Sequence, residues 1–376
     1  MSPKYLDNFN AGPAALPLPV ISKIKEAIQS VEGGPGILEM SHRSSSFDRV
    51  INKAIDQITQ LYRLPESHEV IFLQGGASLQ FAMVPLNLGV LGGFITTGEW
   101  SKRALAEARL VAGEGGQQPR ELWSSQAEGF RSVPREVELA EALEYVHITS
   151  NNTIYGTQYR DLPSLCIIKQ DDAQSSTRTL PFVIDASSDL FSRSIDWSRV
   201  DLVYAGAQKN AGPSGVTIVI GRRELLRGEP CISSCPTLLR YRTHAEKGSL
   251  YHTPNTLGIF AVGEVAQWVN DAGGLEFFEA RAEERATRVY EVIDAYPEIY
   301  QGHAERASRS HMNLTFRMHN AEQEQALLRR ARELGMVGLK GHRSVGGLRA
   351  SLYNAVSDES VNRLINLLEA VATQRA

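Results

Sequence analysis

The sequence predicts an α/β fold in which helices cover a mostly parallel sheet, followed by a smaller α+β domain. Between residues 70 and 220, short apolar runs alternate with segments of helical periodicity, as in a parallel sheet covered by helices. After Pro254 and Asn255 the pattern changes to long helical periodicity, which indicates a domain boundary. With 376 residues and 42% hydrophobic content, the chain can bury the cores of two domains. We assign an N-terminal segment (1–16), a large domain (17–255) and a small C-terminal domain (256–376).

The first predicted elements are two helices. Pro17 and Pro19 near the start, and Gly33 after the end, favour a helix over residues 17–31. Apolar residues at helical spacing predict a second helix over 47–62, which ends before Pro65. The alternating region then gives the strands 70–73, 93–96, 145–148, 182–184, 202–204 and 216–220, with helices over 78–87 and 100–111.

The remaining third of the chain mixes helices and strands. Helical periodicity covers 256–294, and a helix is expected at 322–334 and again from Ser360. Strands are expected at 312–316 and 347–352. The polar segment 169–178 has no period, so we expect an exposed excursion and assign it no function.

Composition excludes several classes of protein. A net charge of −4 offers no general attraction to nucleic acid. The polar start and the absence of an apolar run near the roughly 20 residues that span a bilayer predict a cytoplasmic protein without a membrane segment. Cys166, Cys231 and Cys235 are too few for a disulfide framework and lack the partners of a metal site, so we expect reduced thiols and no metal.

Two predicted strand ends carry the residues of a cofactor site. One apolar run ends in Asp185, and the next is followed by small residues and Lys209. Parallel sheets bind ligands at the carboxyl ends of their strands, so both side chains could meet one ligand. Pyridoxal phosphate needs such a pair: a lysine for a Schiff base with its aldehyde, and an acid that keeps the pyridine nitrogen protonated. Either residue alone would more simply be a solvated lysine or a turn aspartate, and it is the small residues around Lys209 that favour the cofactor.

Other candidate residues follow further predicted strands or lie in basic clusters near the two ends of the chain. Ala77 and Ser78 follow two glycines at a helix start, either as a phosphate cradle or as a plain turn. Trp100 could stack on a flat ring or simply pack, and Thr153 could offer its hydroxyl to a ring oxygen or belong to a polar turn. Two basic clusters suit a substrate with a carboxylate and a phosphate, unless they are surface arginines: His42 with Arg43, and His342 with Arg343 and Arg349.

These residues together resemble the phosphoserine aminotransferase family, pyridoxal phosphate enzymes of the class V aminotransferase group. The resemblance spans nearly the whole chain, with motifs at residues 10–13, 41–43, 80–87, 204–212 and 340–354. It implies a fold-type I pyridoxal-phosphate-dependent transferase that acts as a homodimer with active sites at the subunit interface. It also implies that Lys209 is the Schiff-base lysine and Asp185 the partner of the pyridine nitrogen.

The resemblance assigns further roles residue by residue. For the cofactor, these are Trp100 on the ring, Thr153 at its hydroxyl, Ala77 and Ser78 at the phosphate with Gln208 and Ser187 nearby, and His252 and Thr253 from the neighbouring subunit. For the substrate, Arg349 resembles the arginine that holds the α-carboxylate, and the group at the distal anion is His42, Arg43, His342 and Arg343. The chain departs from the family at three places: Ser78, where some members carry arginine; His252, where many carry asparagine; and the longer segment 169–178.

The implied reaction transfers the amino group of L-glutamate to 3-phosphohydroxypyruvate by a ping-pong scheme in serine biosynthesis. The products are O-phospho-L-serine and 2-oxoglutarate, and acceptance of 4-phosphohydroxythreonine stays open. A cysteine desulfurase would need a mobile cysteine in the last third of the chain, and none follows Cys235. An alanine–glyoxylate transaminase would have little use for the extra cations. A non-catalytic protein with this fold would not need both Asp185 and Lys209.

Overall fold

The large domain is built on a seven-stranded sheet. The computed structural model describes residues 6–139, 143–167 and 180–373, so the predicted excursion at 169–178 lies outside the described residues. The sheet runs in the order β2 (His68–Leu73), β12 (Thr217–Arg222), β11 (Leu202–Gly206), β10 (Phe182–Asp185), β6 (Tyr145–Thr149), β3 (Gly92–Thr96) and β4 (Arg120–Ser124). Only β12 runs antiparallel to its neighbours, which confirms a mostly parallel sheet.

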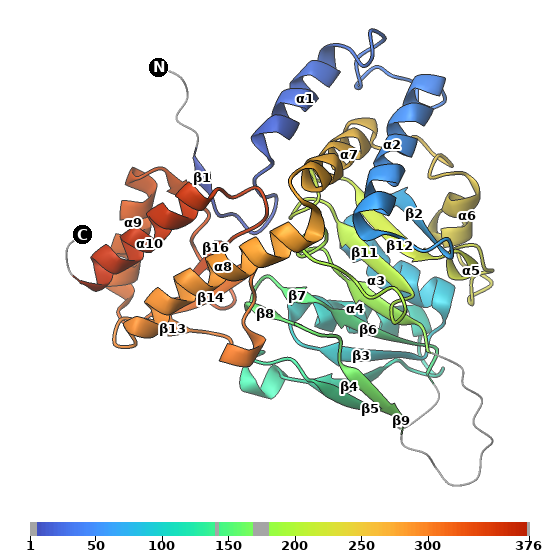
Figure 1. Cartoon of the computed structure of the whole chain (residues 1–376). Coiled ribbons are helices and arrows are strands. Elements are labelled where there is room, and N and C mark those ends of the chain that lie inside the picture. The colour runs from blue at the N-terminus through green and yellow to red at the C-terminus, as the bar shows by residue number, and fades with distance from the viewer. Residues whose placement is uncertain (1–5, 140–142, 168–179, 374–376) are drawn as a thin grey trace.

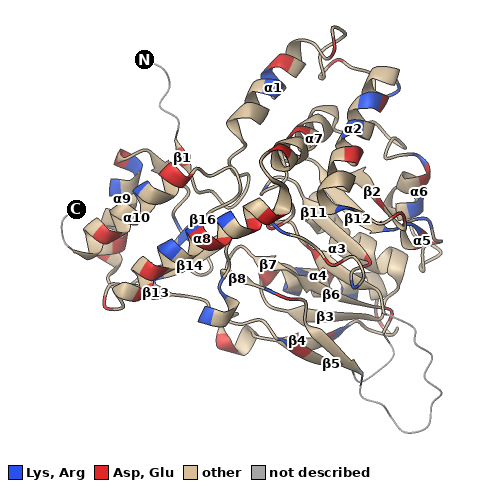
Figure 2. Ribbon diagram, viewed as in Figure 1, with Lys and Arg blue, Asp and Glu red and all other residues tan. Residues whose placement is uncertain are grey.

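Helices cover both faces of this sheet (Figure 1). One face packs against α1 (Leu18–Gln29), α2 (Ser45–Tyr62) and α7 (Thr256–Asp271), and the other against α3 (Gly76–Leu88), α4 (Glu99–Ala112) and α6 (Tyr241–Glu246), with the short α5 (Arg223–Leu226) after β12. Alternation along the strands separates the two cores, since Val146 and Ile148 enter one cluster and Tyr145 the other. Figure 2 shows β3, β6 and β11 almost free of charge, as expected for strands buried on both faces.

The C-terminal part surrounds a three-stranded antiparallel sheet. Its strands are β13 (Tyr300–Gly302), β14 (Asn313–Met318) and β16 (Leu348–Ser351), and its helices are α8 (Gly274–Ala295), α9 (Ala321–Glu333) and α10 (Asp358–Ala372). The N-terminal segment joins this part, because β1 (Asp7–Asn8) pairs in parallel with β15 (Met336–Val337). Phe9 is fully buried in the same hydrophobic cluster. Figure 1 shows β1 beside the C-terminal helices accordingly.

The helical periodicity predicted over 256–294 corresponds to two helices that are separated at Ala272 and Gly273. Helix α7 packs against α1 and α2, and a Cβ on Gly263 would lie 2.9 Å from the Cβ of Ala54. Helix α8 contributes Leu275 to the first cluster and Ala286 to the second. The boundary after residue 255 stays a prediction, and the hydrophobic cluster itself changes within α8.

Smaller strands lie beside the main sheet. A parallel pair joins β5 (Glu136–Leu139) to β9 (Ser164–Ile167), and a short hairpin joins β7 (Asn151–Asn152) to β8 (Thr157–Gln158). The β7–β8 hairpin follows β6 and carries Thr153 in its turn, at the edge of the sheet where β10 ends. None of the helices in the described ranges has the length and apolarity needed to cross a bilayer.

Candidate active site

Asp185 and Lys209 interact at the carboxyl ends of neighbouring strands. Asp185 is the last residue of β10 and pairs in register with Tyr204 of β11, and Lys209 follows three residues after β11. Burial raises the pKa of Asp185, whereas the charge of Lys209 and hydrogen bonds from Ser187 oppose that rise. Burial lowers the pKa of Lys209 to about 8, with Asp185 opposing and Arg349 adding to the shift. A lysine with this pKa has a substantial neutral fraction near pH 8, and the neutral amine is the nucleophile.

Thr153 connects three other predicted site residues. Its hydroxyl accepts hydrogen bonds from Trp100 Nε1 at 3.0 Å and from Lys209 Nζ at 3.3 Å. Its carbonyl oxygen accepts one from Arg349 Nη1 at 3.1 Å. The ammonium of Lys209 also lies 5.3 Å from the centroid of the Trp100 ring. Helix α4, the β7–β8 turn, the segment after β11 and strand β16 therefore meet at this threonine.

The start of α3 has the form of an anion cradle. Gly75 and Gly76 have φ values of 92° and 65°, and a Cβ on Gly75 would lie 2.5 Å from Leu79 Cδ2. No side chain caps this helix start, so its first amides point outward without a side-chain acceptor. Ala77 and Ser78 lie in that first turn, and the preceding Gln74 donates to the carbonyl of Thr253 at 3.0 Å. An uncapped helix start, a buried acid and a half-buried lysine beside an indole together fit pyridoxal phosphate.

Ser187 is held against Asp185. Its hydroxyl donates to Asp185 Oδ1 at 2.6 Å, and its backbone N–H donates to the same oxygen at 3.0 Å. The Ser187 hydroxyl in turn accepts from the N–H of Gly206 at 3.1 Å. Both hydrogen bonds end on Oδ1, so the Asp185 carboxylate is oriented and its second oxygen is left for a ligand. We therefore interpret Ser187 as a residue that positions Asp185.

Replacing Ser187 with alanine is expected to weaken pyridoxal phosphate binding by about tenfold, because a hydrogen bond to a charged group contributes roughly 1.5–3 kcal/mol. The measurement is the cofactor dissociation constant of the apoprotein, followed by absorbance. Ser187→Thr keeps the hydroxyl and should restore affinity. Ser192→Ala is the matched control, because Ser192 is also buried but its hydroxyl donates to the carbonyl of Asp189. Equal losses in Ser187→Ala and Ser192→Ala would show a purely structural effect.

The predicted residues beyond this group fall into two sets, one near it and one without a bond to it. Burial lowers the pKa of His342, and Arg349 and Arg343 lower it further, so the second basic cluster lies near the site. Within the described residues, the side chains of His42, Arg43 and His252 form no hydrogen bond or ion pair with Lys209, Asp185 or Arg349. The roles of these side chains and of Thr253 stay predictions.

A buried pair of asparagines, Asn151 and Asn313, joins the β7–β8 hairpin to the strands β14 and β16. The sequence motifs did not predict this pair. Asn151 Nδ2 donates to Asn313 Oδ1 at 2.7 Å, and Asn313 Nδ2 donates to Ser351 Oγ at 2.9 Å. These bonds hold the β7–β8 hairpin, which carries Thr153, against β14 and β16, which carries Arg349. Asn313, which stands between the apolar Met312 and Leu314, is the sequence signal that points to such a role, because a buried amide needs partners.

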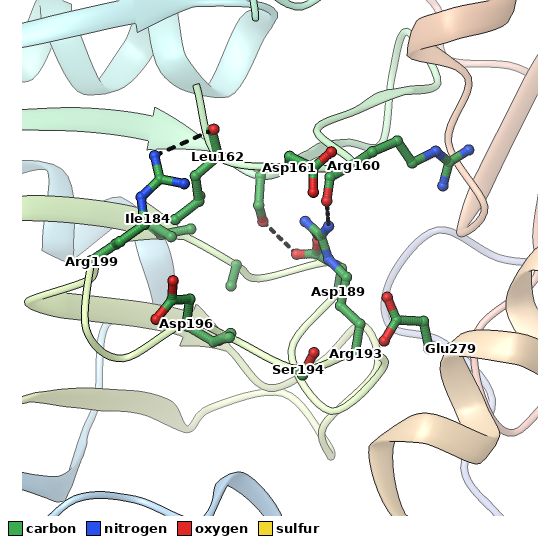
Figure 3. A pocket seen from close by; sticks show the side chains of 13 residues that line it. Arg160, Asp161, Leu162, Ile184, Asp189, Arg193, Ser194, Asp196, Arg199 and Glu279 are labelled. Carbon is green, nitrogen blue, oxygen red and sulfur yellow. Dashed lines mark hydrogen bonds and ion pairs between the residues drawn. The ribbon is translucent and has the colours of Figure 1, made fainter. Parts of the chain in front are cut away.

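A separate cavity of about 270 Å³ lies beside β10 and α8 (Figure 3). Its arginines are occupied by the chain itself: Arg193 donates to the carbonyls of Tyr159 and Arg160, and Arg199 to those of Leu162 and Pro163. Asp189, which Arg193 also contacts, accepts from the Ser150 hydroxyl. The cavity contains none of Lys209, Trp100 and Arg349, so we place the chemistry at Thr153 instead.

Comparisons with known proteins identify the family. Residues 5–364 match the family described as aminotransferase class-V. The chain is 47% identical over 363 residues to the phosphoserine aminotransferase of Lysinibacillus sphaericus, covering 95% of each. It is similar to the solved phosphoserine aminotransferase from Bacillus circulans subsp. alkalophilus, with 41% identity, a TM-score of 0.90 and coverage of 99% and 100%. The pyridoxal-phosphate-bound phosphoserine aminotransferase from Trichomonas vaginalis is 30% identical, with a TM-score of 0.85 and coverage of 97% and 100%. The predicted fold class and family resemblance are confirmed.

Proposed function

We propose that this chain, which belongs to the aminotransferase class-V family, is a pyridoxal-phosphate-dependent transaminase that moves the amino group of L-glutamate to 3-phosphohydroxypyruvate. The products are O-phospho-L-serine and 2-oxoglutarate, and the two half-reactions share one site in turn, as a step of serine biosynthesis. The observation that carries the proposal is the meeting of Lys209, Trp100 and Arg349 at Thr153, with Asp185 facing Lys209.

Each residue in this group has a separate task. Bound pyridoxal phosphate supplies an aldehyde and an electron-withdrawing ring. The Lys209 amine serves as the nucleophile, and afterwards accepts and returns the proton of the substrate carbon. The Asp185 carboxylate would keep the ring nitrogen protonated, and the Trp100 indole would pack against the ring and exclude water. Arg349 binds the α-carboxylate of the substrate, and its guanidinium can do so with two parallel hydrogen bonds.

Substrate choice depends on the basic residues beyond Arg349. Glutamate and O-phosphoserine both carry an α-carboxylate and a second anion at the far end, so one cationic pocket can serve both. We assign the far end to His42, Arg43, His342 and Arg343, of which His342 and Arg343 lie near Arg349. The same chemistry would accept 4-phosphohydroxythreonine, which keeps both anions.

A second copy of the chain completes the site in this proposal. His252 Nδ1 is buried without a hydrogen-bond partner among the described residues. Tyr251 and Leu238 nearby are 46% and 47% exposed, so apolar side chains lie at the surface beside His252. A homodimer would cover them and bring His252 and Thr253 to the partner's cofactor phosphate. We place the enzyme in the cytoplasm, where its three cysteines stay reduced.

The test is a half-reaction titration of the holoenzyme. Candidate amino acids are added singly, and loss of the absorption of the lysine-bound cofactor is recorded. O-phosphoserine and glutamate should discharge this absorption at concentrations at least about tenfold lower than alanine or serine, because a lost charged hydrogen bond costs roughly 1.5–3 kcal/mol. Equal efficiency of alanine would favour an alanine transaminase and contradict the proposal.

A further inference from the structure

Glu99 and Arg103 form an ion pair at the start of α4, and neither residue was among the predicted site residues. Arg103 Nε donates to Glu99 Oε1 at 2.8 Å. The guanidinium carbon of Arg103 lies 5.1 Å from the centroid of the Trp100 ring, and Lys209 Nζ lies 5.3 Å from the same centroid. Arg103 and the reactive lysine therefore both contact the Trp100 ring. Its side chain is 57% exposed, so it can exchange one anionic partner for another.

The charges of the same ion pair act on the second basic cluster. Burial lowers the pKa of His342, the charges of Arg349, Arg343 and Arg103 add to this effect, and Glu99 opposes it. Three arginines from different elements thus act on one imidazole: Arg349 from β16, Arg343 from the loop before it and Arg103 from α4. A convergence of positive charge with a single opposing carboxylate stabilises an anion placed among these groups.

We propose that Arg103 is a specificity-determining residue for the distal anion of the substrate and that Glu99 competes with that anion for Arg103; the inference rests on the function proposed above. Without substrate, Arg103 stays with Glu99. A phosphate dianion offers more charge and more acceptor oxygens than a carboxylate, so it draws Arg103 away from Glu99 more strongly than the γ-carboxylate of glutamate does. Glu99 thereby neutralises the extra cation while glutamate is bound, and one pocket can serve anions of different charge.

The experiment compares substrate affinities of two variants of the holoenzyme in separate half-reaction titrations. Arg103→Gln should weaken O-phosphoserine by about tenfold, the loss typical of one charge-assisted hydrogen bond, and L-glutamate by less than about twofold. Glu99→Gln should increase the affinity for O-phosphoserine relative to that for L-glutamate, because Glu99 no longer competes with phosphate for Arg103. The preference of the wild-type protein for O-phosphoserine should also fall as salt rises, and this salt dependence should be smaller in Arg103→Gln.

The matched control is Arg109→Gln, which removes an exposed arginine from the last turn of the same helix. It should leave both affinities and the cofactor absorption unchanged. Equal losses for O-phosphoserine and glutamate in Arg103→Gln would overturn the inference and indicate that Arg103 only supports Trp100. If the wild-type holoenzyme itself shows no preference for O-phosphoserine over serine, the proposed function fails instead, so the two failures are distinguishable.

Discussion

Lys209→Ala is expected to lower kcat by roughly 10⁴-fold, because the variant loses both the nucleophile and the group that moves the substrate proton. It should also lose the absorption of the lysine-bound cofactor when pyridoxal phosphate is added. Borohydride trapping followed by mass spectrometry is the second measurement, and the cofactor mass should appear on the peptide that contains Lys209 in the wild-type protein but not on the corresponding peptide of Lys209→Ala. Lys25→Ala, which removes an exposed lysine of α1, is the control. Turnover within about tenfold of wild type would contradict the mechanism.

The depressed pKa of Lys209 gives this prediction a pH dependence. Burial lowers the pKa to about 8, and only the neutral amine attacks the aldehyde. The rate at which the apoprotein attaches pyridoxal phosphate should therefore rise as pH increases through about 8 and then level off. Because the positive charge of Arg349 contributes to the lowered pKa, Arg349→Gln should move this profile to higher pH. An unchanged profile in that variant would show that the charge of Arg349 does not contribute to the lysine pKa.

Asp185 and Lys209 were predictable because each follows an apolar run that is visible in the local sequence. Apolar runs that end in Asp185 and precede Lys209 mark strand ends, and the parallel topology brings such ends together. The same reasoning placed Trp100 and Thr153 at the shared edge. Their meeting at a single hydroxyl was not predictable, because it depends on where the β7–β8 turn lies relative to α4.

Features that depend on distant pairing were missed. Strand β1 pairs with β15, more than 300 residues away, and two-residue strands carry no periodicity. Strand β4 begins with Arg120 and Glu121 and lies at the edge of the sheet, where charged side chains are normal. Because these charged residues break the apolar pattern, the sequence did not predict this strand. The positioning role of Ser187 depends on the register of β10 against β11, which brings the Gly206 N–H to its hydroxyl.

Asp185→Asn is expected to lower kcat by about 10³-fold while KM for both amino acids changes little. The amide has the shape of the carboxylate but no charge, so it cannot hold a proton on the ring nitrogen. An ion pair about 4 Å apart contributes roughly 4 kcal/mol at an effective dielectric near 20, and about 1.4 kcal/mol corresponds to a factor of ten. KM is preserved because Arg349, which binds the α-carboxylate, is held by Thr153 independently of Asp185. Steady-state kinetics with separate determination of kcat and KM is the measurement.

Two further variants separate charge from packing at this position. Asp196→Asn changes an exposed aspartate in the segment that follows β10, where it bonds Ser198, and should leave kcat unaltered. Asp185→Glu keeps the charge but displaces it from the hydrogen bonds of Ser187, so its kcat should lie between those of wild type and Asp185→Asn. If the glutamate variant is as impaired as the asparagine variant, placement by Ser187 matters as much as charge. If Asp185→Asn keeps kcat near that of wild type, the ring nitrogen needs no anionic partner and the role assigned to Asp185 is wrong.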